Sequence, residues 1–312
     1  NRTIKMDNNI TNLNQKIIEE ILSTTKSDQQ KIIKNSTTHQ IITNGIPVHT
    51  KVRLLTDEKL TEAKKIFQEM LDNGVIRQSS SNWSSPLLMK RKKDNTWRCC
   101  GDYRRLNAIT IKDEYRVPLI KDVTTRLKDA RYFTKLDLEK AYHQIPMAVE
   151  DIPKTAIITP FGLFEFVMMP FGLKNAASTF QRYMDNIFRG VDFIVVYLDD
   201  ILIGSENIVE HKTHLATTLQ ILKTNGLNLN IKKCEFNKTQ INFLGHTIEN
   251  NTIYPIKEKM EAINSIPPPK NVQEIRRFCG MVNFYHKFIP NCSAILTQLT
   301  EMIKNKKKLE MI

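Results

Sequence analysis

The stretch Phe193-Ile-Val-Val-Tyr-Leu-Asp-Asp-Ile-Leu-Ile-Gly204 decides the fold. Two apolar runs flank the adjacent acids Asp199 and Asp200, which predicts a β-hairpin that carries both carboxylates. An ionised carboxylate in apolar surroundings is unfavourable unless a cation or water compensates it, and two neighbouring carboxylates also repel each other. The pair therefore points to a hard divalent cation. The alternative is an ordinary hairpin tip with both side chains in solvent.

A third acid, Asp137, ends a short apolar strand predicted over residues 133–138. Taken alone, it is equally typical of a cap or turn residue. Together, the three acids would supply oxygen ligands for two Mg²⁺ ions, with Mn²⁺ as an alternative ion. Two such ions about 4 Å apart activate an attacking hydroxyl and neutralise a leaving pyrophosphate. The acids therefore predict nucleotidyl transfer.

The composition favours a polyanionic partner. The 312 residues include 46 Lys and Arg against 33 Asp and Glu, a formal net charge of +13. A hydrophobic content of 41% predicts a folded core and excludes disorder throughout. No apolar run approaches the ~18 residues that a membrane span requires, and no signal pattern is present. We expect an intracellular chain with no membrane partner.

Cysteine and histidine spacing does not predict a zinc site. The five cysteines are odd in number and lack C-x-x-C spacing, so a disulfide framework is not predicted either. His211 and His214 lie three residues apart on a predicted helix, but no third ligand is near them in the sequence. Surface histidines are the preferred interpretation.

Strand and helix patterns alternate irregularly, which predicts an α+β fold. Residues 1–45 are rich in Asn, Thr, Lys and Gln and are interpreted as a flexible linker. The first amphipathic helix is expected to be capped by Thr56 and to stop at Asn73-Gly74. Strands are expected over 87–90 and 96–98 around a basic turn at 92–95, and over 156–159 and 164–168. Helices are expected at about 174–189, 207–225, 271–280 and 293–304.

Short blocks run through the chain in a fixed order. They are Gly74–Arg77, Trp97–Arg98, Asp102–Asn107, Leu136–Leu138, Asp151–Ala156, Phe161–Phe166, Met169–Leu173, Asn175–Ala177, Thr179–Gln181, Tyr197–Asp200 and Phe243–His246. In this order, the chain resembles the reverse transcriptase of gypsy-type long-terminal-repeat retrotransposons (Ty3/gypsy, Metaviridae-like) over about residues 37–303. The resemblance implies a right-hand polymerase with fingers, palm and thumb, in which helices back an antiparallel palm sheet.

The resemblance also implies domain bounds. Residues 1–45 would be the linker, 46–111 and 145–169 the fingers, 112–144 and 170–249 the palm, and 250–312 the thumb and the start of the connection. A ribonuclease H domain is expected to be absent, because the chain stops at Ile312.

Individual residues receive roles from the resemblance. Asp137, Asp199 and Asp200 become the metal-binding catalytic acids, in agreement with the carboxylate argument. Lys233, in preference to Lys232, becomes the general acid for the leaving pyrophosphate. The expected nucleotide-binding residues are Lys92, Arg98, Leu138, Tyr142, Phe171 and Gly172, and the expected primer- and template-binding residues are Asn175, Gln181, Leu244 and Gly245.

Several of these roles have a physical reason and an alternative. A ring at Tyr142 under the sugar would collide with a ribose 2′-hydroxyl, so DNA would be made; a packed tyrosine is the alternative. Lys92 and Arg98 would clamp the triphosphate, although a solvated basic turn is as plausible for the lysines. Gly245 would let the primer backbone come close, but glycine also suits a plain hairpin turn. The Leu138 carbonyl would be a further metal ligand.

The leading hypothesis is an RNA-directed DNA polymerase that extends a primer on an RNA or DNA template with deoxynucleoside triphosphates. The second is a catalytically idle remnant that keeps the fold and binds nucleic acid through its positive charge. The intact acids argue against the second. An RNA-templated RNA polymerase is a third hypothesis, and Tyr142 discriminates against it. A retroelement polymerase is expected in a cytoplasmic virus-like particle, with the nucleus as the alternative.

Overall fold

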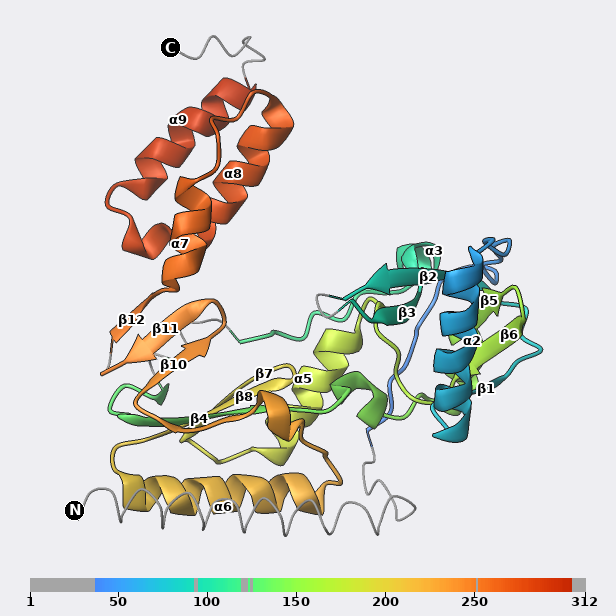
Figure 1. The fold of residues 1–312 in the computed structure, drawn as a ribbon, viewed down its shortest axis with the longest axis horizontal. Coiled ribbons are helices and arrows are strands. Elements are labelled where there is room, and N and C mark those ends of the chain that lie inside the picture. The colour runs from blue at the N-terminus through green and yellow to red at the C-terminus, as the bar shows by residue number, and fades with distance from the viewer. Residues whose placement is uncertain (1–36, 93–94, 119–122, 124–125, 251, 305–312) are drawn as a thin grey trace.

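The computed structural model describes residues 37–92, 95–118, 123, 126–250 and 252–304. Its elements form three groups, and the middle group contains the four-stranded sheet (Figure 1). One group with a five-stranded sheet lies on the right of the view, the four-stranded sheet lies at the lower centre, and a column of helices rises on the left. The groups follow the order expected for fingers, palm and thumb.

The expected fingers contain a helix packed on a five-stranded sheet in the order β1-β6-β5-β2-β3. Helix α2 buries Ala63 and Phe67, and the Phe67 ring meets Phe161 and Phe164 edge-on. The helix ends before Gly74 as predicted, but Thr56 makes no side-chain cap. The elements are α2 (Asp57–Asp72), β1 (Ile76–Gln78), β2 (Ser85–Arg91), β3 (Trp97–Gly101), α3 (Arg104–Ile109), η2 (Val149–Thr155), β5 (Ile157–Thr159) and β6 (Gly162–Phe166).

The expected palm is a four-stranded antiparallel sheet in the order β7-β8-β4-β9. Ile201 and Ile203 of β8 belong to one hydrophobic core, whereas Leu202 between them belongs to a second. Both faces of β8 are therefore covered, which explains its uninterrupted apolar run. The elements are β4 (Tyr132–Asp137), η1 (Ala141–Gln144), α5 (Ala176–Ile187), β7 (Ile194–Tyr197), β8 (Asp200–Ser205), α6 (Ile208–Thr224), η3 (Ile231–Lys233) and β9 (Glu235–Lys238).

A three-stranded sheet, β10-β11-β12, crosses the expected boundary between palm and thumb at residues 249–250, and it leads into the helices of the expected thumb (Figure 1). The predicted helices at 271–280 and 293–304 are confirmed, and the first extends to Phe284. The Asn271 side chain accepts from the Glu274 N–H, a cap that the sequence contains but that we did not predict. The elements are β10 (Gln240–Phe243), β11 (His246–Glu249), β12 (Thr252–Pro255), α7 (Lys257–Asn264), α8 (Val272–Phe284), η4 (His286–Phe288) and α9 (Cys292–Lys304).

The end of the expected linker is part of the folded core. His39 and Ile41 are each 1% exposed. The His39 Nδ1 lies 2.9 Å from the Thr179 hydroxyl, and the Ile41 N–H donates to Asp151 Oδ2 over 2.8 Å. The expectation of a flexible linker is therefore wrong for residues 37–44, because apolar burial and side-chain hydrogen bonds anchor them. Residues 1–36 lie outside the described part of the chain.

The histidine pair is also not on the surface as expected. His211 is buried, with Nε2 2.8 Å from the Thr134 hydroxyl and Nδ1 2.8 Å from the Ser205 hydroxyl. Burial lowers the pKa of His211 to about 4. His214 lies 2.8 Å from the same Ser205 oxygen, and its ring stacks on Phe193. The pair therefore ties α6 to the palm sheet.

Candidate active site

The acids occupy a tight turn between β7 and β8, which we call the acid turn (Leu198-Asp199). Tyr197 pairs with Asp200 across the hairpin, so Leu198 and Asp199 form its two-residue loop. Leu198 has φ 55, a left-handed conformation that costs a non-glycine residue about 1–2 kcal/mol. Such a conformation persists only where the surroundings hold it in place.

A buried amide from α5 holds the acid turn. Gln181 is 0% exposed. Its Oε1 accepts from the Leu198 N–H over 2.9 Å, and its Nε2 donates to the Val196 carbonyl over 3.1 Å and to Asp185 Oδ1 over 2.9 Å. The strained residue of the turn is therefore bonded directly to the helix behind it.

The sheet register brings the third acid to the same place. Asp137 at the end of β4 pairs with Asp200 at the start of β8. The Leu138 N–H donates to the Asp199 carbonyl over 3.2 Å, so the chain after β4 is joined to the acid turn. Asp199 is exposed, whereas Asp137 and Asp200 are half-buried. The structure thus brings together all three predicted acids and the Leu138 backbone.

Two lysines lie against the acids. Lys233 Nζ is 3.5 Å from Asp137 Oδ1, and Lys135 Nζ is 3.4 Å from Asp200 Oδ1. Burial raises the pKa of Asp137, an effect that Lys233 opposes and Asp199 increases. Burial also raises the pKa of Asp200, and here Lys135 opposes the effect.

The donor chemistry fits a hard cation. Three neighbouring carboxylates that repel one another, two of them half-buried, are what Mg²⁺ or Mn²⁺ would stabilise. Within the described ranges, no group of three His, Cys, Asp or Glu side chains is already arranged as a metal site. Ion binding at these acids would therefore require the carboxylates to turn toward a common point, with the lysines giving way.

An aromatic surface adjoins the acids. Tyr142 on η1 lies 5.0 Å from Phe171 and 5.5 Å from Phe180, measured between ring centroids. The Arg98 guanidinium lies 5.2 Å from the centroid of the Phe171 ring. Burial raises the pKa of Tyr142 to about 12, and the charge of Asp199 contributes. Arg98, Tyr142 and Phe171 were predicted separately as nucleotide-binding residues, and the structure makes them neighbours.

Gly172 next to this surface has φ 95, a conformation that favours glycine. Its carbonyl accepts from Asn107 Nδ2 over 2.8 Å. Lys92, the other predicted clamp, is exposed in the β2–β3 turn, whose residues 93–94 lie outside the described part. Its N–H donates to the Thr96 carbonyl.

Two predicted primer- and template-binding side chains are used inside the protein instead. Asn175 is 8% exposed, donates to the Ile111 carbonyl over 2.7 Å and accepts from the Asp113 N–H over 3.0 Å. Gln181 is fully buried beneath the acid turn. Direct contact of these side chains with nucleic acid is therefore not available in this conformation, because their polar atoms already have partners.

The other predicted primer-binding pair forms a second tight turn, the glycine turn (Leu244-Gly245), between β10 and β11. Leu244 has φ 48 and Gly245 φ 80. The Tyr285 hydroxyl donates to the Gly245 carbonyl over 3.2 Å, and His246 Nδ1 lies 3.0 Å from the Leu244 carbonyl. Burial lowers the pKa of His246. The thumb therefore contacts the glycine turn directly.

Sequence reasoning missed three residues of this site. Lys135 stands two positions before Asp137 on a strand, a spacing that places both on one face and could have revealed it. Asp185 has the helical i, i+4 spacing from Gln181, which is typical of paired side chains. Tyr285 has no local sequence signal for this role, because its bond to Gly245 depends on tertiary structure.

Comparisons with known proteins agree with this site. A family model described as Reverse transcriptase (RNA-dependent DNA polymerase) matches residues 90–248. The chain belongs to the reverse transcriptase family. The family suggested by the sequence blocks is thereby confirmed.

The related proteins are polyproteins of transposons. The Retrovirus-related Pol polyprotein from transposon 297 of Drosophila melanogaster is 39% identical over 293 residues, which cover 91% of this chain and 28% of that protein. The Transposon Tf2-3 polyprotein of Schizosaccharomyces pombe is 36% identical over 236 residues, which cover 75% of this chain and 18% of that protein. This chain thus spans less than a third of the length of either relative.

Solved structures support the fold. The foamy viral protease-reverse transcriptase dRH in complex with double-stranded DNA matches with a TM-score of 0.80 and 22% identity, over 87% of this chain and 48% of that chain. The foamy viral protease-reverse transcriptase in complex with an RNA/DNA hybrid matches with a TM-score of 0.77 and 22% identity, over 93% and 40%. The predicted right-hand α+β architecture is confirmed. Among the described residues, no helix is long and apolar enough to cross a membrane.

Proposed function

We propose that this chain is the RNA-directed DNA polymerase part of a long-terminal-repeat retrotransposon Pol polyprotein. It extends a primer on an RNA or DNA template with deoxynucleoside triphosphates. The observation that carries the proposal is the meeting of Asp137, Asp199 and Asp200 from neighbouring strands beside the surface formed by Arg98 and Phe171. The family membership and the complexes formed by the foamy viral neighbours support it.

Asp137, Asp199 and Asp200 would hold two Mg²⁺ ions, with Mn²⁺ as the alternative and the Leu138 carbonyl as a further ligand. Bound there, the ions would activate the primer 3′-hydroxyl and offset the charge of the leaving pyrophosphate. Lys233 has a side chain that is 66% exposed, so its ammonium can move from Asp137 to a phosphate oxygen. We assign it the proton donated to pyrophosphate.

Arg98 and Lys92 would bind the triphosphate. The guanidinium of Arg98 packs on the Phe171 ring, so the charge is held in place before substrate arrives. Gly172 beside it would allow the nucleotide to come close to the backbone, because its φ of 95 favours glycine and sets the turn of the chain after Phe171.

The Tyr142 ring would exclude ribonucleotides. It packs between Phe171 and Phe180, and this contact limits its movement away from a 2′-hydroxyl. We expect Tyr142→Ala to increase ribonucleotide use relative to deoxyribonucleotide use by about 10-fold or more, while Tyr142→Phe keeps the wild-type ratio because the ring remains. An unchanged ratio in Tyr142→Ala would remove the assignment.

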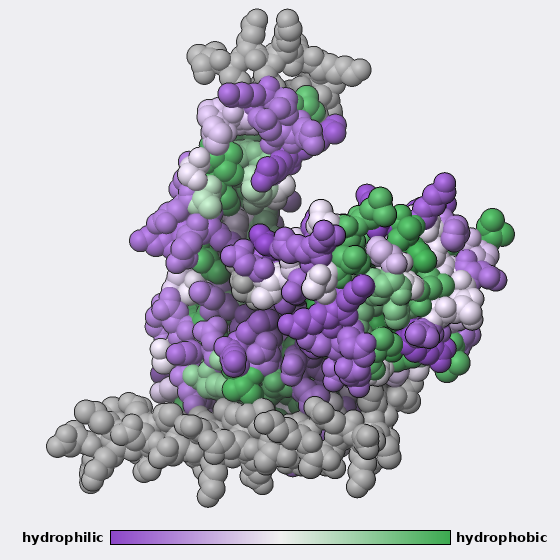
Figure 2. All heavy atoms as spheres, turned by 45° about the vertical axis from the view of Figure 1, so that its right-hand side comes forward, coloured by the Kyte–Doolittle hydropathy of each residue, from purple (hydrophilic) through white to green (hydrophobic). Residues whose placement is uncertain are grey.

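Template and primer would lie between the thumb and the fingers. Figure 2 shows the surface hollowed there, with hydrophilic side chains along much of the rim. Leu244 and Gly245 would contact the primer backbone. Asn175 and Gln181 would act indirectly, by shaping the segment before α5 and the acid turn. The net charge of +13 favours the duplex electrostatically.

Primer extension on an RNA template with Mg²⁺ and deoxynucleotides tests the proposal. Wild type should extend the primer, and Asp199→Asn, which preserves the size of the side chain, should abolish extension while still binding primer–template. A folded wild type that binds primer–template without extending it would favour the idle nucleic-acid-binding remnant instead. The intact acid turn favours the polymerase.

A further inference from the structure

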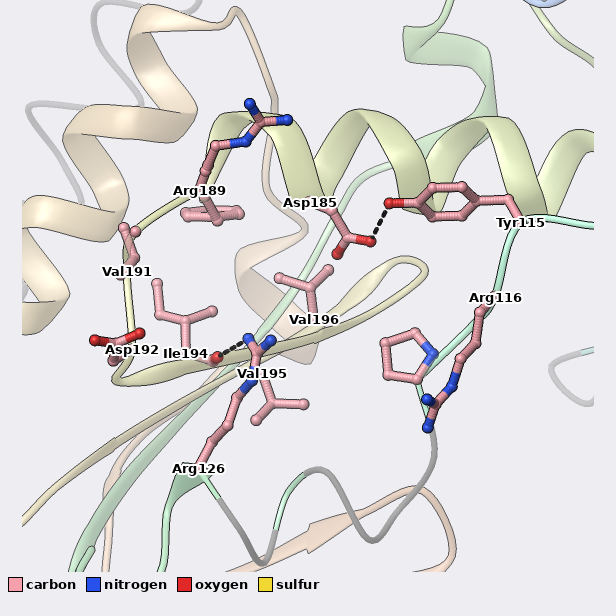
Figure 3. Close-up of a pocket in the computed structure, with 13 residues that line it drawn as sticks. Tyr115, Arg116, Arg126, Asp185, Arg189, Val191, Asp192, Ile194, Val195 and Val196 are labelled. Carbon is pink, nitrogen blue, oxygen red and sulfur yellow. Dashed lines mark hydrogen bonds between the residues drawn. The ribbon is translucent and has the colours of Figure 1, made fainter.

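A chain of side-chain hydrogen bonds connects the acid turn with a cavity between the last turns of α5 and β7. The cavity has a volume of about 690 Å³ and lies at the outer edge of β7, beside the last turns of α5 and the segment 115–118 (Figure 3). Tyr115, Asp185 and Val196 are among its lining residues. Asp185 and Tyr115 point toward each other there and are joined by a hydrogen bond.

The connection has three links. The Tyr115 hydroxyl donates to Asp185 Oδ2 over 2.7 Å. The other oxygen of Asp185 accepts from Gln181 Nε2 over 2.9 Å. Gln181 Oε1 in turn accepts from the Leu198 N–H over 2.9 Å. The path therefore runs from the cavity, along one face of α5, to the left-handed residue of the acid turn.

Asp185 and the Val196 carbonyl together determine which way the Gln181 amide faces. An ionised carboxylate and a backbone carbonyl only accept hydrogen bonds, so Asp185 and Val196 both require the NH₂ end of the amide. The oxygen end is then left for the Leu198 N–H. A reversed amide would place NH₂ against N–H and would lose the support of the turn. The orientation follows from these partners alone.

The outer end of the path is also held. Arg182 lies 4.6 Å above the centroid of the Tyr115 ring and forms two hydrogen bonds with the Asp113 carboxylate. These contacts fix the ring whose hydroxyl orients Asp185. Asp185 itself is only half-buried, so the path begins at the wall of the cavity and becomes fully buried at Gln181.

We propose that Asp185 and Tyr115 are positioning residues for the acid turn, acting through the orientation of the Gln181 amide. The inference rests on the proposed function for the catalytic role of the acid turn, whereas the hydrogen-bond path does not depend on that function. Neither residue touches the acids. Their effect is to keep Leu198 in place, so that Asp199 and Asp200 stay on the side of the hairpin that faces Asp137.

Asp185→Asn tests the inference, because it keeps the shape of the side chain but replaces one acceptor oxygen by a donor. Gln181 then loses one of the two partners that require its NH₂ end, and the Val196 carbonyl alone keeps that requirement. We expect turnover to fall about 10-fold, the half-saturating Mg²⁺ concentration to rise ~3–5-fold, and the KM for primer–template to stay unchanged. Exchange of the Leu198 amide hydrogen, followed at residue resolution, should accelerate about 10-fold.

Tyr115→Phe removes one hydroxyl and keeps the ring under Arg182, so it serves as a milder second variant. It should change the same quantities in the same direction by about 2–3-fold. The matched control is Tyr183→Phe on the same helix, which also loses a hydroxyl bond, there to the Asn225 carbonyl at 3.4 Å. This control should leave the Mg²⁺ requirement and the Leu198 exchange at wild-type values.

The inference is overturned if folded Asp185→Asn and Tyr115→Phe keep wild-type Leu198 exchange and Mg²⁺ requirement, or if Tyr183→Phe changes both equally. If Asp185→Asn does not fold, Tyr115→Phe decides by the same two measurements. Amide exchange needs no catalysis. A chain that cannot extend a primer but shows faster Leu198 exchange in the variants would therefore refute the proposed function and support the positioning path.

Discussion

The acid turn and the glycine turn are built alike and held differently. Both are two-residue hairpin loops that begin with a leucine in the left-handed region, at φ 55 for Leu198 and φ 48 for Leu244. The acid turn is bonded to Gln181 of α5, which backs the same palm sheet. The glycine turn is bonded to Tyr285, just after α8 in the thumb. One turn is therefore fixed within its layer, and the other depends on a neighbouring group of elements.

This difference indicates that one turn serves the chemical step and the other serves primer–template binding. A turn that is anchored inside the palm can keep charged groups in register to within a fraction of an ångström, as a chemical step requires. A turn that is anchored to the thumb takes the position that the thumb dictates. Changes near the acid turn should therefore alter turnover, whereas changes at the glycine turn should alter primer–template affinity.

The largest effect is expected for the cation beside the acid turn. Lys233→Gln removes the ammonium that lies 3.5 Å from Asp137 Oδ1. Loss of a general acid lowers turnover by about 100-fold, while primer–template affinity should change little. Single-turnover kinetics at saturating primer–template would measure this.

Lys232→Gln is the matched control, because its side chain is exposed on the same short helix, η3. It should retain wild-type turnover. If the two variants are equally slow, the loss reflects the local positive charge rather than proton donation by Lys233. If Lys232→Gln alone is slow, the assignment passes to Lys232.

Gly245→Ala should produce the next largest effect, and on affinity. At φ 80 a Cβ is strained, and the added atom would lie 3.1 Å from Lys259 Nζ and 3.4 Å from Phe284 Cε1. The Lys259 tip or the turn must move by a few tenths of an ångström to relieve these contacts, and the unfavourable φ adds strain in the turn itself. We expect primer–template to bind about 10-fold more weakly, with turnover at saturation near wild type. Fluorescence anisotropy with a labelled duplex would measure the affinity.

Gly226→Ala is a suitable control for Gly245→Ala. Its φ of 70 gives comparable backbone strain, but no atom lies within 4 Å of the added Cβ. It should lower thermal stability without weakening primer–template binding. Equal weakening in both variants would mean that backbone strain reduces affinity through general destabilisation.

A smaller effect is expected from the link between thumb and glycine turn. Tyr285→Phe keeps the ring among its neighbours and removes the hydroxyl that donates to the Gly245 carbonyl. A neutral hydrogen bond contributes about 1 kcal/mol, so affinity for primer–template should fall by ~3–5-fold. Turnover at saturating duplex should not change. A fall in turnover with unchanged affinity would contradict the assignment of primer–template binding to the glycine turn.

Both turns and the strands that carry the three acids could be predicted from the sequence. The hairpin around Asp199 and Asp200 and the strand that ends at Asp137 were predicted from apolar periodicity, and the structure joins them in one sheet. Local patterns sufficed because strand length and the interrupting acids are short-range signals. The Leu244-Gly245 turn was assigned by its resemblance to a family block, because glycine alone suits any hairpin.

The supports of the two turns were not predicted, since they depend on tertiary contacts. Gln181 was expected to contact template or primer, but it is buried because α5 turns this side chain toward the hairpin. Residues 37–44 have a linker-like composition, yet Ile41 belongs to the hydrophobic core. Composition does not record which segment fills a gap between fingers and palm, so burial of such a segment must be seen in three dimensions.

The smallest effect concerns pH, because the palm sheet and the glycine turn each contact a histidine with a lowered pKa. His211 bonds to Thr134 and Ser205, toward the end of β4 and β8 away from the acid turn, and burial lowers its pKa to about 4. His246 adjoins the glycine turn, and burial lowers its pKa as well. The ordinary pKa is 6.5, so the unfolded chain takes up protons first as pH falls below it. The stability that the neutral histidines provide is complete above pH 6.5 and is lost as pH falls toward their folded pKa values.

His246→Gln isolates the contribution of His246. Glutamine has no charge to gain, so this variant should lose part of the decrease in thermal midpoint between pH 6.5 and pH 4, by about 1–2 °C. It should keep the part that belongs to the other histidines whose pKa burial lowers, His39, His143 and His211. Primer–template affinity should also become less sensitive to acid, because a protonated His246 would have to carry a charge among the rings of Phe284, Tyr285 and Phe288. Melting curves and anisotropy over this pH range would measure both quantities. The variant could weaken the pH dependence of the thermal midpoint but leave the pH dependence of primer–template affinity unchanged. In that case, protonation of His246 does not reach the primer through the glycine turn.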